Sequence, residues 1–200
     1  KPYLFYTADY GATWTQITKG IDSEHFTRVI RADPKVKGLL YAGTEHGFYL
    51  SSDNGANWKQ TQLNLPIVPI TDLTIKENML IAATQGRSIW MIDDLSALQQ
   101  LAAEASTPKS ARLFTPGDAW RMKGYGGKSG KLSGQNHPNG VLVHFWLKEL
   151  PGPKDTVSLA FFDAEGKLVR RFSNKSTDAK LELSKGGNRF VWDMRYPGAE

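Results

Sequence analysis

The chain has 200 residues, of which 40% are hydrophobic, it contains no cysteine, and its formal net charge is +5. This length allows one large or two small domains, and the hydrophobic content excludes a disordered chain. Disulfides, cysteine nucleophiles and cysteine-bound metals are excluded, the small and interspersed basic excess argues against nucleic-acid binding, and no apolar run approaches the roughly 20 residues of a membrane span.

The first half of the chain reads as a series of short β-strands. Runs rich in aromatic and β-branched residues alternate with turn signals such as Asp-Tyr-Gly and Asp-Asn-Gly, which is typical of an all-β fold. The chain opens inside the first run, so we expect it to be a fragment of a longer protein. The predicted strands are Leu4–Thr7, Thr13–Thr18, Thr27–Ala32, Leu39–Gly43, Gly47–Ser51, Trp58–Gln62, Ile70–Ile75 and Met79–Ala83.

One helix is predicted, over Leu95–Ala105, with Asp93 or Asp94 placed to cap its start. A stretch of low hydrophobicity follows at 106–139 and contains GYGGKSGKLSGQ, which we expect to be a mobile connector. This stretch lacks the spacing of a phosphate-binding Walker A loop. The apolar stripe of the predicted helix consists of Leu95, Leu98, Leu101 and Ala102.

The last part of the chain, 140–200, reads as a β-sandwich. Apolar residues alternate along 141–147 and 157–161, Asp163-Ala-Glu-Gly166 is a hairpin turn into Lys167–Phe172, and the alternation returns at Leu181 and Leu183 and over Asn188–Met194. Only four or five strands can be counted, whereas an immunoglobulin-like sandwich has about seven. We therefore expect an immunoglobulin-like sandwich that is incomplete.

Two stretches of the first half are near copies of each other: TADYGATW at 7–14 and SSDNGANW at 51–58. Their aspartates, Asp9 and Asp53, lie 44 positions apart (53 minus 9). A longer similarity aligns LLYAGTEHGFYLSSD (39–53) with LIAATQGRSIWMIDD (80–94), where the glycine and tryptophan of the turn are lost. A period of about 40–50 residues is typical of β-propeller blades, each of four strands.

These turns match the pattern S/T-x-D-x-G-x-T/S-W, the Asp box, and the chain resembles the BNR or Asp-box β-propellers, which include sialidases, xyloglucanase-type glycoside hydrolases and sortilin-like receptors. The resemblance extends to exported bacterial proteins of the BNR-repeat glycosyl hydrolase type, through ATQGRSIWMIDDLSALQQ and the ending GGNRFVWDMRYPGAE. The C-terminal part is also similar to the immunoglobulin-like domain of flagellar hook-capping proteins. The resemblance implies propeller blades at 1–105, a connector at 106–139, a truncated sandwich at 140–200, and an extracellular or periplasmic bacterial protein.

We interpret the box residues as structural. The aspartate can accept hydrogen bonds across the turn together with the hydroxyl residue, the glycine allows a positive φ, and the tryptophan is expected to pack between sheets. Neither the calcium pattern of an EF-hand nor a facing pair of catalytic carboxylates fits, so we expect no metal and no catalytic residue here. The box positions are Thr7, Asp9, Gly11, Thr13, Trp14, Ser51, Asp53, Gly55 and Trp58.

Three other residues are candidates for facing a ligand. Glu45 and His46 lie between consecutive blade strands, in loops that can reach the central cleft of a propeller; a surface turn is the alternative interpretation. Arg87, in TQGRS, is similar to an arginine at the end of the family's propeller, where the junction with the following helix is the other role for it.

The sequence thus predicts a binding or scaffolding part of an exported Asp-box propeller protein, without a cofactor and without catalysis of its own, that engages a glycan or a protein. The alternative is the cleft wall of a sialidase-like or xyloglucanase-like hydrolase whose catalytic carboxylates lie outside this chain, so an enzymatic parent protein stays open. Incomplete blades expose sheet edges. We therefore expect the fragment to pair with the remainder of its own propeller or with a second copy.

Overall fold

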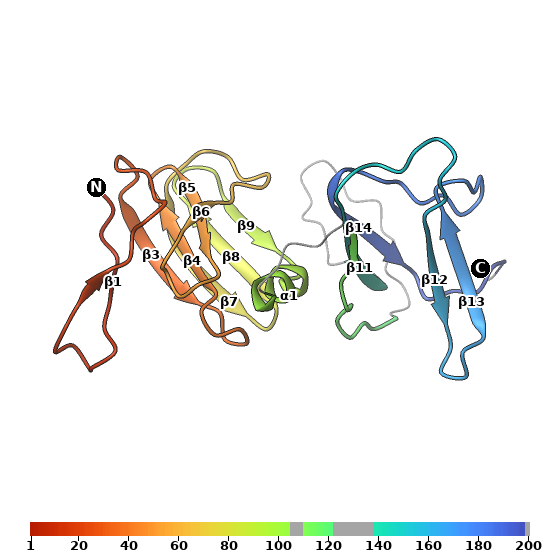
Figure 1. Cartoon of the computed structure of the whole chain (residues 1–200), viewed down its shortest axis with the longest axis horizontal. Helices are drawn as coiled ribbons and strands as arrows, with labels where there is room; N and C mark the ends of the chain where they lie inside the picture. Colours follow the sequence, from red (N-terminus) through yellow and green to blue (C-terminus); the bar gives the residue numbers. More distant parts are fainter. Residues whose placement is uncertain (105–109, 122–137, 199–200) are drawn as a thin grey trace. The chain divides into compact units, whose positions relative to one another are not determined.

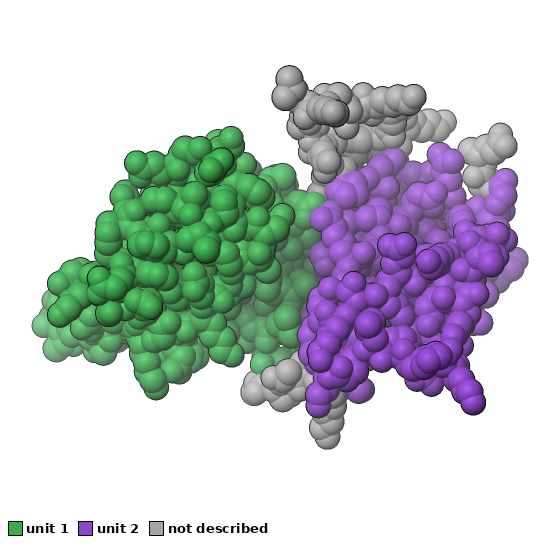
Figure 2. Space-filling view, turned by 90° about the horizontal axis from the view of Figure 1, so that it is seen from above, with its two compact units in different colours: residues 1–105 green, residues 106–200 purple. Residues whose placement is uncertain are grey.

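The computed structural model describes residues 1–104, 110–121 and 138–198, and the predicted mobile segment GYGGKSGKLSGQ lies outside these ranges. The chain divides into two compact units, Lys1–Ala105 and Ser106–Glu200 (Figure 2), which are described separately below. Both consist mainly of antiparallel sheets, and the predicted all-β fold is confirmed. Among the described residues, no helix has the length and apolar character that crossing a membrane requires.

The first unit contains three antiparallel sheets that follow one another along the chain (Figure 1). Most predicted strands are present, but Leu4–Thr7, Thr13–Thr18 and Trp58–Gln62, beside the two box turns, are each reduced to two residues. The sheets are β1 (Phe5–Tyr6) with β2 (Thr15–Gln16); β3 (Thr27–Ala32), β4 (Leu40–Thr44), β5 (Gly47–Ser51) and β6 (Lys59–Gln60); and β7 (Ile70–Lys76), β8 (Met79–Thr84) and β9 (Ile89–Ile92).

The middle sheet, β3–β6, is covered on both faces. Successive side chains of β4 point to opposite faces, and Tyr41 and Ala42 belong to different core clusters. Tyr41 packs in a cluster with residues of the third sheet such as Leu73, whereas Ala42 packs with Leu4 from the first hairpin. The three sheets of this unit therefore pack face to face, with β3–β6 between the other two.

The second and third sheets repeat a detail of their pairing. The register between β3 and β4 shifts after Thr27, and the register between β7 and β8 shifts after Ile70. In both sheets the extra residue of this β-bulge is the second residue of the first strand, Arg28 or Thr71. A bulge conserved between the copies supports a genuine structural repeat, in addition to the sequence similarity.

The helix α1 (Ser96–Ala103) replaces a fourth strand after β9. Leu95, at its N-cap, is fully buried, and Leu98 and Ala102 pack on the same cluster. Leu101 is 37% exposed, so its assignment to the apolar stripe is wrong. The carboxylate of Asp94 accepts hydrogen bonds from the amide and the hydroxyl of Ser96, at 2.8 and 2.9 Å. The first of these bonds satisfies an amide hydrogen of the first turn that has no partner within the helix.

The second unit has five described strands in two sheets, whose side chains share one core of Phe145, Leu147 and Leu181. The predicted connector contains one strand, β10, which pairs with β11 and was not predicted, because its three residues are too short a pattern. The predicted strand around Leu181 is also wrong, because only an isolated bridge forms, at Lys180, and Leu181 is buried by packing. The strands are β10 (Ala111–Leu113), β11 (Val141–Leu147), β12 (Ser158–Phe162), β13 (Leu168–Ser173) and β14 (Gly186–Trp192).

Candidate functional site

The first box turn, 7–14, is closed by its own side chains. Asp9 Oδ1 accepts hydrogen bonds from the Thr13 amide and the Thr7 hydroxyl, both at 2.8 Å, and Asp9 Oδ2 accepts one from the Thr13 hydroxyl at 2.6 Å. The Thr7 hydroxyl in turn accepts the amide hydrogen of Gly11 at 2.8 Å. Hydrogen bonds from Thr13 lower the pKa of Asp9 to about 2, since they favour its ionised form.

The second box turn, 51–58, repeats this network with other side chains. Asp53 Oδ1 accepts from the Asn57 amide and the Ser51 hydroxyl, Asp53 Oδ2 accepts from the Asn57 side-chain amide, all at 2.8 Å, and the Ser51 hydroxyl accepts from Gly55 N at 2.9 Å. Burial raises the pKa of Asp53, but the hydrogen bonds from Asn57 and Ser51 outweigh it and lower the pKa overall. In both turns, both oxygens of the carboxylate are therefore occupied.

The backbone conformation of the two turns explains why each turn has a glycine, Gly11 or Gly55, at its second central position. The central residues have positive φ in both copies, 56° and 93° at Tyr10 and Gly11, and 58° and 85° at Asn54 and Gly55. Two successive positive φ values are typical of the type I′ turns that join hairpin strands. A Cβ at position 55 would also lie only 2.6 Å from Ile17 Cδ1.

The two box tryptophans differ in environment. Trp58 is 3% exposed, and it donates its indole hydrogen to Ile17 O at 2.7 Å and its amide hydrogen to Lys19 O at 2.8 Å. Trp14 is 61% exposed and donates to Gly11 O of its own turn at 3.1 Å. The prediction that both pack between sheets is therefore wrong for Trp14, because Trp58 packs on the preceding repeat and no described residue occupies that place for Trp14.

The third copy keeps part of the box without forming a hairpin. In the second copy the amide of Asn54 donates to Gly38 O at 2.8 Å; in the third, the amide of Leu95 donates to Asn78 O at 2.9 Å. Asp94 thus lies at the position of Asp53, but its carboxylate binds the start of α1 and the side-chain amide of Asn78, at 2.7 Å. In the third copy, the aspartate of the box therefore holds the start of a helix and does not close a hairpin turn.

A second cluster of polar side chains lies at the other end of the middle sheet, around the turn between β4 and β5. The imidazole rings of His25 and His46 stack with centroids 4.5 Å apart and an interplanar angle of 13°. His25 Nδ1 lies 2.8 Å from the hydroxyl oxygen of Tyr49, whose pKa burial raises. Sequence reasoning missed His25, because 21 positions separate it from His46 and no motif links them.

Glu45 and Arg28 form an ion pair beside these rings. The Glu45 side chain is only 14% exposed, and the guanidinium of Arg28 also lies over the ring of Phe26, 5.6 Å from its centroid. We call the set His25, Phe26, Arg28, Glu45, His46 and Tyr49 the turn cluster. It presents rings, hydrogen-bonding groups and both signs of charge at the end of the sheet opposite the box turn.

The structure places Arg87 differently from the other two ligand-facing candidates. Its side chain is exposed in the turn between β8 and β9, and its carbonyl accepts the indole hydrogen of Trp90 at 2.8 Å. The described contacts therefore keep Arg87 within its own turn, whereas Glu45 and His46 belong to the turn cluster.

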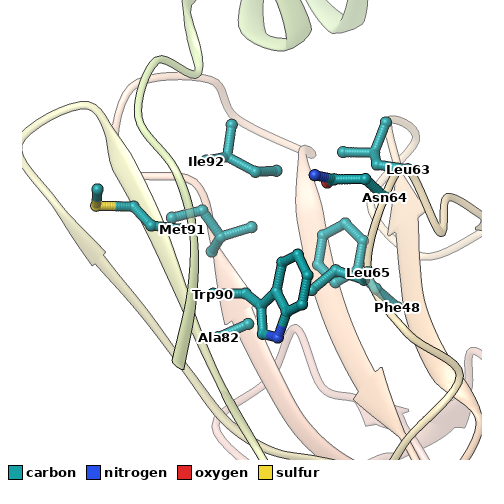
Figure 3. Close-up of a pocket in the computed structure, with 9 residues that line it drawn as sticks. Phe48, Leu63, Asn64, Leu65, Ala82, Trp90, Met91 and Ile92 are labelled. Atoms are coloured by element: carbon teal, nitrogen blue, oxygen red, sulfur yellow. The ribbon is translucent and has the colours of Figure 1, made fainter. Parts of the chain in front are cut away.

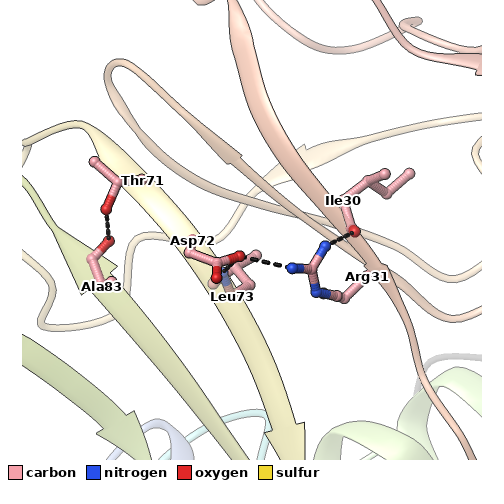
Figure 4. Close-up of polar contacts among 6 residues, drawn as sticks. All are labelled: Ile30, Arg31, Thr71, Asp72, Leu73 and Ala83. Atoms are coloured by element: carbon pink, nitrogen blue, oxygen red, sulfur yellow. Dashed lines mark hydrogen bonds and ion pairs between the residues drawn. The ribbon is translucent and has the colours of Figure 1, made fainter.

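An exposed ion pair joins the first strands of the second and third sheets (Figure 4). Arg31 donates to Asp72 Oδ1 at 2.7 Å and to Ile30 O at 2.9 Å, and Asp72 Oδ1 also accepts the amide hydrogen of Leu73. An ion pair of two exposed side chains contributes little to stability. It nevertheless shows that β3 and β7, the first strands of their sheets, lie close together.

Comparison with protein-family models, with curated proteins and with solved structures finds no match for this chain. Within the described ranges, no group of three or more histidine, aspartate or glutamate side chains is arranged to hold a metal ion.

Proposed function

We propose that this chain is the non-catalytic binding and scaffolding part of an exported Asp-box β-propeller protein, and that it engages a glycan or protein ligand through the turn cluster. The fold supports this proposal, because the three sheets of the first unit pack face to face as copies of one repeat. The box turn joins the last two strands of the first and second sheets, and the second and third sheets share the same bulge. The immunoglobulin-like assignment of the second unit belongs to the same proposal.

One observation carries the proposal most directly. The carboxylates of Asp9 and Asp53 use both oxygens to close their own turns. A general acid or a nucleophile needs a carboxyl group directed at the substrate, with a second one about 5–10 Å away. This supports a structural role for the repeated motif, and we place the proposed recognition function elsewhere on the unit.

The turn cluster is the part of this unit best suited to recognition. Ring faces at His46 and Phe26 offer apolar contact, while Arg28 and Glu45 offer hydrogen-bonding groups. The buried hydroxyl of Tyr49 holds His25 in place. A ligand with both apolar faces and polar edges, such as a sugar ring or a peptide, matches this combination. Glu45 is held by the guanidinium of Arg28 and serves as a fixed charge.

The test is ligand binding by variants of the intact chain. We expect binding to members of a glycan array or a peptide array, and a loss of at least about tenfold in affinity for His46→Ala and Arg28→Ala, as for truncated interface anchors. The matched control is Lys37→Ala, an exposed residue at the box end of the same sheet, which should bind as the parent chain does. Equal binding by all three variants would contradict the proposed site.

The same preparation separates the glycoside hydrolase alternative. The chain is incubated with sialyllactose and with xyloglucan oligosaccharides, and released sugars are measured. The proposal expects no release, because Glu45 after β4 and Asp72 within β7 are each paired with an arginine. Release that disappears in Glu45→Gln or Asp72→Asn would instead establish an enzyme.

A further inference from the structure

An apolar hollow opens between the second and third sheets of the first unit (Figure 3). Its lining comes from β5, from the loop after β6, and from β8 and β9. Figure 3 shows Trp90 and Ile92 of β9 facing Leu65 and the loop residue Leu63 across the hollow. The main lining residues are Phe48, Leu63, Leu65, Ala82, Trp90 and Met91.

The interface between the first and second sheets is the equivalent place one repeat earlier, and there the hollow is filled. Ala42 pairs with Tyr49 across β4 and β5, as Ala82 pairs with Trp90 across β8 and β9. Both Ala42 and Tyr49 belong to the second core cluster, together with Trp58. The indole of Trp58 therefore closes the place that stands open beside Trp90.

The other members of that cluster also have counterparts around the hollow. Leu4 corresponds to Phe48 and Ile21 to Leu65, each 44 positions later, the same interval that separates the two boxes. Trp58 alone has no counterpart, because the third copy turns into α1 after Asp94. The hollow is thus the second core cluster without its tryptophan.

The third sheet also lacks the strand that would carry such a tryptophan. In the second sheet, β6 follows Trp58 directly and pairs antiparallel with β5. In the third sheet, β9 pairs with β8 on one side, and among the described residues no strand pairs with its other side. An unpaired strand edge offers backbone donors and acceptors to an added strand.

From this comparison we infer that the edge of β9 and the adjacent hollow form a binding site for an extended peptide segment of the Asp-box strand type. The segment adds to β9 as an antiparallel fourth strand and packs a tryptophan side chain between Leu63 and Trp90. The hollow itself measures only about 20 Å³, so Leu63 and its loop move outward to admit the indole. Leu63 is 60% exposed at this site, and an inserted indole would cover it. The inference rests on the repeat and its packing, and is independent of the proposed ligand at the turn cluster.

The probe is a peptide copy of the second box turn and of β6, the fourth strand of the second sheet. A fluorescein-labelled peptide with the sequence of residues 51–62, SSDNGANWKQTQ, is titrated with the intact chain, and fluorescence anisotropy is measured. We expect saturable binding, and a loss of at least about tenfold in affinity when alanine replaces the tryptophan of the peptide, since a buried aromatic anchor carries much of the energy of such an interface.

Variants of the protein test the location of the site. Leu63 has a φ of 49°, so Leu63→Asn keeps a residue that tolerates this conformation while removing the apolar side chain. It should weaken the peptide by at least about tenfold, as an interface anchor does. The matched control is Ile67→Asn, because Ile67 lies in the same loop and is 72% exposed but does not line the hollow; it should leave the affinity unchanged.

Three outcomes would overturn the inference: no binding, equal binding of the tryptophan and alanine peptides, or equal loss in the two loop variants. A fourth outcome would show that a different molecule fills the hollow. If the chain forms dimers that Leu63→Asn dissociates and that exclude the peptide, a second copy covers the hollow and the inferred peptide ligand is wrong.

Discussion

At the scale of single residues, Asp9 shows how a turn with two residues at positive φ is held without a core. Three hydrogen bonds from Thr7 and Thr13 converge on its carboxylate, although the turn is exposed. Each such bond contributes only modestly in water. Their convergence on one ionised group couples the turn to pH.

We predict an acid-sensitive first hairpin. Because the pKa of Asp9 falls from its ordinary 3.8 to about 2 in the folded chain, the folded state binds fewer protons than the unfolded one in this range. The stability contributed by ionised Asp9 is therefore fully present above about pH 4 and is lost as the pH falls towards about 2. NMR titration of the Asp9 carboxyl carbon measures the folded-state midpoint directly.

Thr13→Ala is the informative variant for this titration, because the hydrogen bonds of Thr13 are the main cause of the shift. Its carboxyl midpoint should move up towards the ordinary value. Thr15→Ala removes a hydroxyl from the adjacent strand, which has no described bond to Asp9, and should leave the midpoint in place. An unchanged midpoint in Thr13→Ala would show that another interaction lowers the pKa.

At the scale of elements, the packing of each sheet on the preceding one decides how much the tryptophan of a box turn contributes to stability. Trp58 lies between the first hairpin and the middle sheet, with its backbone so close to the chain after β2 that a Cβ at Gly20 would lie 2.2 Å from Trp58 O. Trp14 lies on the outer side of the first hairpin and contacts its own turn. The two tryptophans form a matched pair for measuring the interface.

We predict that Trp58→Ala lowers the free energy of unfolding by about 3–5 kcal/mol, the usual cost of removing a fully buried large aromatic side chain. Trp14→Ala removes the equivalent atoms from an exposed site and should cost less than about 1 kcal/mol. Urea denaturation of both variants provides the comparison. Similar losses for the two would mean that the box tryptophan acts within its own turn.

This difference between the tryptophans marks how far the sequence predicts the structure. The strands Thr27–Ala32 and Gly47–Ser51 were predictable to the residue, because their apolar and β-branched pattern is bounded by turns on both sides. The exposure of Trp14 was not predictable, because burial depends on the neighbouring sheet, whereas the local motifs around Trp14 and Trp58 are nearly the same.

The turn cluster was predictable only in part, for a similar reason. Glu45 and His46 adjoin each other in a recognisable turn, whereas His25 reaches them from a separate loop through packing. The three-residue strand β10 and the packed but unpaired Leu181 also depend on partners distant in the sequence.

At the scale of the whole molecule, the two compact units have separate hydrophobic cores. The first unit is built around residues such as Tyr41 and Phe48, and the second around Phe145 and Leu181. A unit with its own core unfolds as its own cooperative transition when few contacts link it to the rest of the chain. Variants in each core can therefore identify which transition belongs to which unit.

We predict two transitions in calorimetry of the intact chain, each sensitive to one core. Trp58→Ala should lower the midpoint of one transition by roughly 10 °C or more, because a loss of several kcal/mol has this effect in a domain of about 100 residues. Leu181→Ala, at a site that is 2% exposed, should shift only the other transition. If both variants shift a single common transition, the cores are energetically coupled, and a ligand bound at the proposed turn-cluster site would then stabilise the second unit as well as the first.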